Sequence, residues 1–296
     1  MSETTPITIL AMPKPFHGHI GTIQRNAITS WTKLQPRPEI ILFGHEEGAA
    51  GCAREFGLVH VPDVDRNRHG TPLLAAILAS AERHASHDLF AYINADIILP
   101  AEFTTGVERV RQKFPEFLVV GRRTNLEIRE QLDFGDGWEE KLKGRVGHEG
   151  QLESHTSIDC FVFRKGTYEG VPPLAIGRVW FDQWFIKYAR KEGLPVVDLT
   201  DFVPIVHQSH DYNHVAGGRQ WVYNGVEAEE NLVQYGEHPH TYTILSATHR
   251  VTQEGRIRRV FFRKETYAVH NFLWEIFVNK TLSVRKRLGL SRRARA

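Results

Sequence analysis

The stretch "LFAYINADIILP", residues 89–100, decides the fold because it combines the pattern of a core strand with polar side chains. Its apolar residues run almost without interruption, as is typical of a strand covered on both faces of a sheet. Asn94 and Asp96 lie inside this run. Alternate residues of a strand share a face, so the sequence predicts both side chains on one face near the strand's end. Ligands of open α/β sheets bind beyond the carboxyl ends of the strands, where this pair would lie.

Two interpretations of Asn94 and Asp96 follow from their residue types. Both types favour turns, so the pair can simply start a turn ahead of Pro100. Alternatively, the carboxylate holds a divalent cation that neutralises the oxygens of a bound phosphate. The stretch by itself favours neither interpretation.

Outward from this stretch, strand and helix patterns alternate through the first 120 residues. The sequence predicts strands over 7–12, 39–44, 58–62, 89–99 and 116–123, with helices over 20–34, 71–85 and 103–114. This alternation predicts an α/β fold with a mostly parallel open sheet and helices on both faces. The second half is less regular, with a long loop predicted over 133–157, a strand over 159–166, a helix over 180–193 and two short strands after it.

Composition places the chain among ordinary globular proteins, at 41% hydrophobic and 24% charged residues with a net charge of +2. Two cysteines cannot build a disulfide framework or a cysteine zinc site, which indicates a reducing compartment. No signal peptide is expected at the N-terminus, and no run approaches the roughly 18 apolar residues of a membrane span. We therefore expect a cytoplasmic protein.

Histidines gather in "HQSHDYNH", residues 207–214. Imidazole and carboxylate together suit a borderline transition metal such as manganese or zinc, so His207, His210 and Asp211 are candidate ligands. The alternative is a polar surface loop, since the chain contains 16 histidines.

Asp182, in "GRVWFDQWF", lies near the start of the helical pattern over 180–193. The helix dipole favours an anion there, so the residue can be a plain first-turn acid. Its aromatic neighbours suggest instead a partly dry cleft, in which the pKa of Asp182 would rise into the range of a general base. Those neighbours are Trp180, Phe181, Trp184 and Phe185.

Two loops are expected at the same edge of the sheet. The first, "PKPFHGHIG" over 13–21, begins at Pro13 and contains neither a P-loop nor a GxGxxG motif, yet it is placed to meet a nucleotide. Arg25, on the helix that follows, is either an ion-pair residue or a diphosphate contact. The second loop, over 61–72, contributes Asp65 and Arg68 or is only a turn.

Taken in order over residues 5–250, these features resemble the nucleotide-sugar-dependent glycosyltransferases of the GT-A type. The resemblance places "NAD", residues 94–96, where the family has its Asp-x-Asp motif. Asp96 would then bind the metal, while Asn94, which replaces the first acid, and Ala95 would lie beside the ribose or donor sugar.

The resemblance also implies roles for residues later in the chain. His210 would complete the metal site, favoured over His207 because Asp211 lies beside it. Asp182 would deprotonate the acceptor hydroxyl, although Phe181 replaces the usual acidic neighbour. Asp65 would contact the base or ribose.

The function implied is an inverting glycosyltransferase of the hexosyltransferase type that depends on Mn²⁺ or Mg²⁺. It would move a sugar from a nucleotide sugar, a UDP-sugar, to a glycan or lipid-linked glycan, as in polysaccharide biosynthesis. The alternatives are a sugar-phosphate nucleotidyltransferase on a related fold and a non-catalytic module that binds nucleotides or glycans.

The domain division expected is a GT-A-like catalytic domain over 1–250, with a nucleotide-sugar half (1–123) and an acceptor half (124–250). A helical extension over 251–296 follows. Its aromatic and basic part, 270–296, either lies in a membrane interface as a peripheral contact or packs on the core. We expect no nucleic-acid partner.

Overall fold

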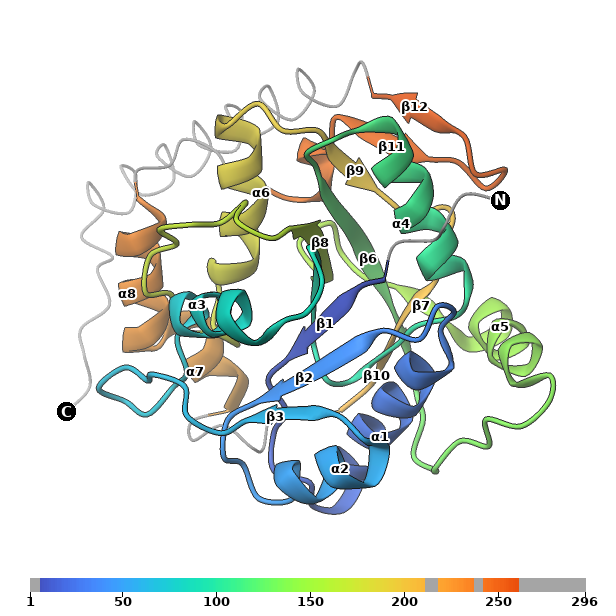
Figure 1. Cartoon of the computed structure of the whole chain (residues 1–296), viewed down its shortest axis with the longest axis horizontal. Coiled ribbons are helices and arrows are strands. Elements are labelled where there is room, and N and C mark those ends of the chain that lie inside the picture. The colour runs from blue at the N-terminus through green and yellow to red at the C-terminus, as the bar shows by residue number, and fades with distance from the viewer. Residues whose placement is uncertain (1–5, 211–217, 237–241, 261–296) are drawn as a thin grey trace, which may run out of the picture.

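The computed structural model describes residues 6–210, 218–236 and 242–260, and its fold is an open, mixed but mostly parallel sheet between two layers of helices (Figure 1). β1 pairs in parallel with β2 and β4, whereas β8 is antiparallel to both β4 and β6. In spatial order the strands are β12 (Ile257–Arg259), β11 (His249–Val251), β9 (Val196–Asp198), β6 (Leu118–Leu126), β8 (Ile158–Arg164), β4 (Leu89–Ile93), β1 (Thr8–Ala11), β2 (Glu39–Phe43) and β3 (Val59–Val61). The α/β class predicted from the sequence is therefore confirmed.

Three short strands extend the sheet beside the end of β6. β10 (Ile205–Gln208) runs parallel to β6 and pairs antiparallel with β5 (Ile97–Ile98), while β7 (Gln151–Leu152) is antiparallel to β6. This pairing brings the histidine segment next to the stretch at 94–98.

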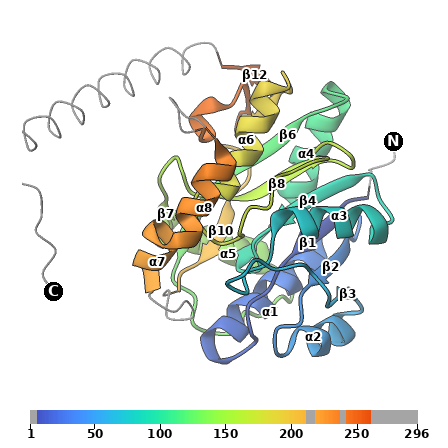
Figure 2. The ribbon, with the colours of Figure 1, turned by 90° about the vertical axis from the view of Figure 1, so that its left-hand side faces the viewer.

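Alternation along the strands produces two cores, one on each face of the sheet. In β1, Ile9 and Leu10 are both fully buried but belong to opposite cores. One face is covered by α1 (Gly18–Lys33), α2 (Ala49–Phe56) and α4 (Glu102–Lys113). The other is covered by α3 (Leu74–His84), α6 (Phe181–Lys191) and α8 (Val226–Tyr235), with α6 and α8 side by side (Figure 2).

Helix α1 joins the first core to the edge where the site lies. Ile23, Ala27 and Trp31 recur every four residues and are fully buried, so they form the apolar face of the helix predicted over 20–34. The indole N–H of Trp31 donates a hydrogen bond to the carbonyl of Ile97 at 2.8 Å. The helix thus fixes the position of β5, which follows Asp96.

Two predictions about elements were wrong. The strand expected over 89–99 breaks after Ile93 and resumes as β5, because residues 94–96 form a turn. The loop expected over 133–157 contains α5 (Trp138–Glu149). Among its charged residues, Trp138, Leu142 and Val146 recur every four positions and pack on a separate small core, so an amphipathic helix forms.

Among the described residues, the last elements are α7 (Gly218–Asn224), α8, the 3₁₀ helix η1 (Ile244–Ser246) and the β11–β12 hairpin. The predicted domain boundary at residue 250 lies within β11, which pairs with β9 in the main sheet. The segment 270–296 and Asp211 lie outside the described residues. In the parts of the chain that the structure describes, no helix combines the length and apolar character needed to cross a membrane.

Candidate active site

The turn at residues 94–96 is held by hydrogen bonds that neighbouring elements make to its backbone. The N–H of Asn94 donates to the carbonyl of Asp159 on β8 at 3.2 Å. The side-chain amide of Gln208, at the end of β10, donates to the carbonyls of Asp96 and Ile23 at 3.1 and 2.7 Å. The turn interpretation of the sequence is correct for the backbone. The same turn leaves the side chain of Asp96 in a buried polar cluster.

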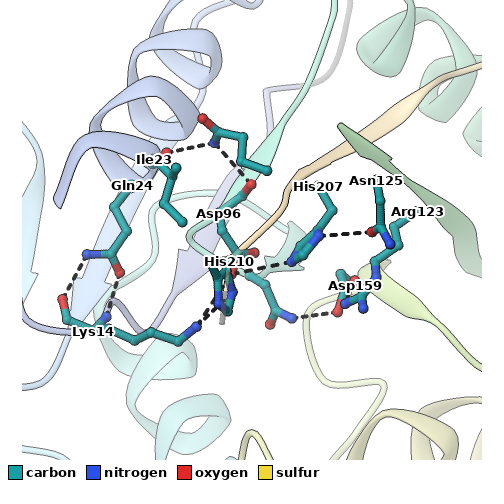
Figure 3. Close-up of polar contacts among 11 residues, drawn as sticks. Lys14, Ile23, Gln24, Asp96, Arg123, Asn125, Asp159, His207 and His210 are labelled. Carbon is teal, nitrogen blue, oxygen red and sulfur yellow. Dashed lines mark hydrogen bonds and ion pairs between the residues drawn. The ribbon is translucent and has the colours of Figure 1, made fainter. Parts of the chain in front are cut away.

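That cluster consists of Asp96, His207 and His210, whose potential ligand atoms all lie within 4.8 Å of one another (Figure 3). Oδ2 of Asp96 lies 3.1 Å from Nε2 of His210 and 3.9 Å from Nε2 of His207. All three side chains are at most 10% exposed. Both histidines that the sequence offered as alternatives therefore lie beside Asp96.

His207 is oriented by a second layer of side chains. Asn125 on β6 donates its side-chain N–H to Glu153 at 2.8 Å, so its oxygen faces Nδ1 of His207 at 3.0 Å and accepts from it. A proton on Nδ1 leaves the lone pair of Nε2 directed toward Asp96. Burial lowers the pKa of His207 to about 4, so the ring is neutral at pH 7. A neutral imidazole is the form that binds metal ions.

The donor set of this cluster fits a divalent cation. Among the described residues, Oδ1 of Asp96 is buried and has no hydrogen-bond partner, which is costly for a carboxylate unless an ion or water satisfies it. Burial by itself would raise the pKa of Asp96, but the hydrogen bond with His210 and the charge of Lys14 hold it well below its usual range. A carboxylate with two imidazoles suits Mn²⁺ or Zn²⁺. Asp96, His207 and His210 are thus the residues that would hold the ion.

A second acidic centre, Asp159, was not identified from the sequence. It lies on β8 between β4 and β6, and it accepts hydrogen bonds from the amide of Asn94 at 2.6 Å and from Nη1 of Arg123 at 2.9 Å (Figure 3). The side chain of Asn94 thus points toward Asp159. It does not point toward Asp96, His207 and His210, which are called the metal-type cluster below. The signal was present, because Asp159 is an acid inside the apolar run "IDCFVF", as Asp96 is in its own stretch.

Asp182 lies in the first turn of α6, and the backbone just before this turn has an unusual conformation. The residue that caps the helix, Trp180, has φ of 81°, a left-handed conformation that is rare for a bulky side chain and commonly marks a functional site. Burial, reinforced by the charge of Asp159, raises the pKa of Asp182 to about 7, although backbone N–H groups at the helix start oppose the rise. A carboxylate of that pKa can accept a proton near neutral pH.

One cavity of about 1240 Å³ brings these groups together. Asp96, His207 and His210 line it, and so do Asp159 and Asp182. Its remaining walls come from the loop after β1, the residues before α3, the segment before α6 and helix α7, including residues 12–15, 69–72, 176–179 and 221–223. A cavity of this volume is large enough for a small-molecule ligand.

The other residues singled out in the sequence divide into two groups. Pro13, Asn94 and Ala95 line the cavity. Arg25, Asp65 and Arg68 are not among the described residues that line it. Arg25 forms an ion pair with Glu55 at 2.5 Å, Arg68 pairs with Glu230, and the backbone carbonyl of Asp65 accepts a hydrogen bond from Leu73. Contacts of these three with a nucleotide remain predictions.

Comparison with known proteins gives similarity of structure only. No family model and no curated protein matches the chain. A mannosyltransferase from Pyrobaculum calidifontis, solved with GDP-Man and Mn²⁺, is similar at 13% identity and a TM-score of 0.45 over 79% of this chain, which spans 64% of that protein. Glucosyl-3-phosphoglycerate synthase from Mycobacterium tuberculosis, solved with Mn²⁺, UDP-glucose and phosphoglyceric acid, is similar at 14% identity and a TM-score of 0.48, covering 79% of this chain and 81% of that one.

TarS from S. aureus, solved with UDP-GlcNAc, is similar at 10% identity and a TM-score of 0.47, covering 71% of this chain and 61% of that one. The solved structures that this chain is similar to thus include proteins bound to nucleotide sugars, the donors used by the family that the sequence features resemble. The likeness extends no further than the fold.

Proposed function

We propose that the chain is a metal-dependent, inverting glycosyltransferase. It moves a hexose from a nucleoside-diphosphate sugar of the UDP-sugar class to a hydroxyl group of a glycan or lipid-linked glycan. One observation carries the proposal: a single cavity is lined both by the cluster of Asp96, His207 and His210 and by Asp182, with its raised pKa. Metal ligands and a general base in one cavity are the two parts that such a transfer requires.

The donor would be bound at the metal-type cluster. Asp96, His207 and His210 would hold Mn²⁺ or Mg²⁺, an ion that neutralises the charge of a diphosphate when bound. The side-chain oxygen of Asn94 would accept a hydrogen bond from a ribose or sugar hydroxyl, since its amide nitrogen already donates to Asp159. Pro13 and Ala95, which line the cavity, would border the nucleotide.

The chemical step would need one proton acceptor, and Asp182 fits this role. The acceptor oxygen attacks the anomeric carbon while Asp182 takes its proton. The new carbon–oxygen bond forms as the bond to the phosphate oxygen breaks, and the electron pair leaves with the nucleoside diphosphate. Attack from the side opposite the leaving group inverts the anomeric configuration. Because the pKa of Asp182 is about 7, a large fraction of the carboxyl groups is ready to accept a proton at neutral pH.

The test is release of nucleoside diphosphate from a panel of nucleotide sugars with Mn²⁺, with Mg²⁺ and with EDTA. The wild type is compared with Asp96→Ala and Asp182→Ala. Asp201→Ala is the matched control, since Asp201 is an exposed carboxylate near Arg250. We expect release that requires a divalent cation, falls at least about 100-fold in the first two variants and is unchanged in the control.

Three other outcomes would contradict the proposal. Formation of pyrophosphate from a nucleoside triphosphate and a sugar phosphate would identify a nucleotidyltransferase. Tight binding of UDP with no turnover on any acceptor would identify a binding module. Turnover that is unaffected by EDTA and by Asp96→Ala would exclude a role for the cluster.

A further inference from the structure

The ammonium group of Lys14 lies at the metal-type cluster, an arrangement that the proposed roles leave unexplained. Lys14 follows β1, and its Nζ lies 3.6 Å from Oδ2 of Asp96 and 3.2 Å from Nε2 of His210 (Figure 3). These are the same two atoms that approach each other at 3.1 Å. A protein cation thus stands beside the atoms that would bind a metal cation.

The backbone of Lys14 is held in place by a buried side chain. Gln24, on α1, is 1% exposed. Its oxygen accepts from the N–H of Lys14 at 2.6 Å, and its amide donates to the carbonyl of Lys14 at 2.9 Å. Both backbone groups of one residue are therefore satisfied by one glutamine, which fixes the loop to the helix.

The residues on either side of Lys14 restrict it further. Pro13 and Pro15 each have a φ angle fixed by their ring, and a residue that precedes proline is confined to extended conformations. A lysine normally samples many positions on the surface, whereas the start of this side chain is fixed. The side chain of Lys14 is 30% exposed, so the ammonium can still move along the cavity that it lines.

The positive charge of Lys14 compensates the negative charge of Asp96. Asp96 is buried, and an isolated buried carboxylate is unstable unless a positive charge compensates it. The ammonium group of Lys14 supplies such a charge, because its Nζ lies at ion-pair distance from Oδ2 of Asp96. A divalent cation bound to the same carboxylate would lie a few ångströms from the ammonium and repel it.

We propose that Lys14 is an internal counter-cation that competes with the divalent cation for Asp96. In the metal-free protein its ammonium neutralises Asp96. When the metal binds, the ammonium is displaced along the cavity and takes a diphosphate as its new partner. The metal displaces the ammonium from Asp96, and the diphosphate gives the displaced ammonium a new partner. Binding of either the metal or the nucleotide therefore favours binding of the other. The competition stands on the cluster itself, and only the diphosphate half rests on the proposed function.

The experiment measures binding of Mn²⁺ alone, by electron paramagnetic resonance of the free ion or by calorimetry. Lys14→Met removes the charge and keeps an unbranched apolar side chain, Lys14→Arg keeps the charge, and Lys33→Met is the control because Lys33 is exposed on α1. We expect Lys14→Met to bind Mn²⁺ about tenfold more tightly than the wild type, corresponding to about 1.4 kcal/mol. The other two variants should bind it as the wild type does.

Mn²⁺ affinity that is unchanged or weaker in Lys14→Met would overturn the competition, as would Mn²⁺ binding that survives Asp96→Ala. Absence of Mn²⁺ binding in both the wild type and Lys14→Met would overturn it as well. The same titrations are then repeated with UDP. We expect UDP to tighten Mn²⁺ binding at least tenfold in the wild type and by less than threefold in Lys14→Met.

The two failures are distinguishable. If Lys14→Met binds Mn²⁺ more tightly but UDP does not bind to any variant, the counter-cation role stands and the nucleotide-sugar function fails. If UDP binds and tightens Mn²⁺ equally in the wild type and in Lys14→Met, the displacement of Lys14 to the diphosphate is wrong while the proposed function survives.

Discussion

At the scale of single residues, Asp182 carries the prediction that separates catalysis from binding. Because its pKa is about 7, the fraction that can accept a proton rises with pH through this value. We expect kcat/KM of the wild type to rise about tenfold per pH unit below pH 7 and to level off above it. Asp182→Asn should lower kcat by roughly 10² to 10⁴ and lose this dependence. A wild-type profile that is flat between pH 5 and pH 8 would exclude Asp182 as the base.

The same carboxyl group should make the native state less stable as the pH rises. Its native pKa, about 7, is above the roughly 3.9 of an unfolded aspartate, so between these values the native state binds the proton that the unfolded state has released. Stability is therefore lost as the pH increases from about 4 to 7. We expect Asp182→Asn to be more stable than the wild type at pH 8 by about 1–3 kcal/mol, allowing for partial exposure, with little difference at pH 4.

Urea unfolding of both proteins at pH 4 and at pH 8 measures this difference. A gain of the same size at both pH values would mean that the asparagine acts through packing and not through the proton. An active-site group that opposes folding while serving the reaction would follow the usual conflict between stability and activity.

At the scale of elements, Asp159 connects three neighbouring strands. It accepts from Asn94, which follows β4, and from Arg123 on β6, while its own side chain is 10% exposed. We expect Asp159→Ala to cost about 2–4 kcal/mol, because it removes the acceptor of two donors inside the sheet. The double variant Arg123→Met/Asp159→Leu should recover part of that loss, since it replaces both charges with apolar groups.

Denaturant unfolding with an unchanged m-value tests this prediction. The single variants Arg123→Met and Asp159→Leu complete a double-mutant cycle with the double variant. Equal stability of Asp159→Ala and the wild type would mean that Asp159 is held for function and contributes nothing to the sheet.

The elements also show where sequence patterns succeed. The helix predicted over 20–34 corresponds to α1, because burial of one helical face leaves a periodic pattern of apolar residues such as Ile23, Ala27 and Trp31. Helix α5 was missed, since its three apolar residues are scattered among charges in a segment with several glycines. The break between β4 and β5 was missed as well. Hydrophobicity continues through the turn, because Ala95 is buried inside it and Ile97 resumes the strand directly after it.

The site was predictable in its residue types but not in its assembly. Asp96 stood out as a carboxylate in an apolar run, and the histidines stood out by their density. Asp96 and His210 are 114 positions apart, and the β5–β10 pairing that joins them leaves no periodic signal. The two hydrogen bonds between the side chain of Gln24 and the backbone of Lys14 likewise depend on how α1 packs against the loop. The sequence alone does not reveal this packing.

At the scale of the whole molecule, the metal-type cluster closes a large loop of the chain. Asp96 follows β4 and His207 lies on β10, so an ion bound by both joins segments that are far apart in the sequence. The unfolded chain does not keep these residues together, so Mn²⁺ binds essentially the native state alone. A free concentration of 100 times Kd would stabilise the fold by about 2.7 kcal/mol and raise Tm by roughly 4–5 °C.

Thermal unfolding in EDTA and in increasing Mn²⁺ measures this shift. The increase should follow the logarithm of the free Mn²⁺ concentration above Kd, and it should vanish in Asp96→Ala and His207→Ala. His148→Ala is the matched control, since His148 is exposed on α5, and it should show the full increase. An equal increase in His207→Ala and the wild type would place the stabilising ion elsewhere. Because the shift reports binding to the fold and not turnover, it tests the metal site even where the correct donor and acceptor have not been found.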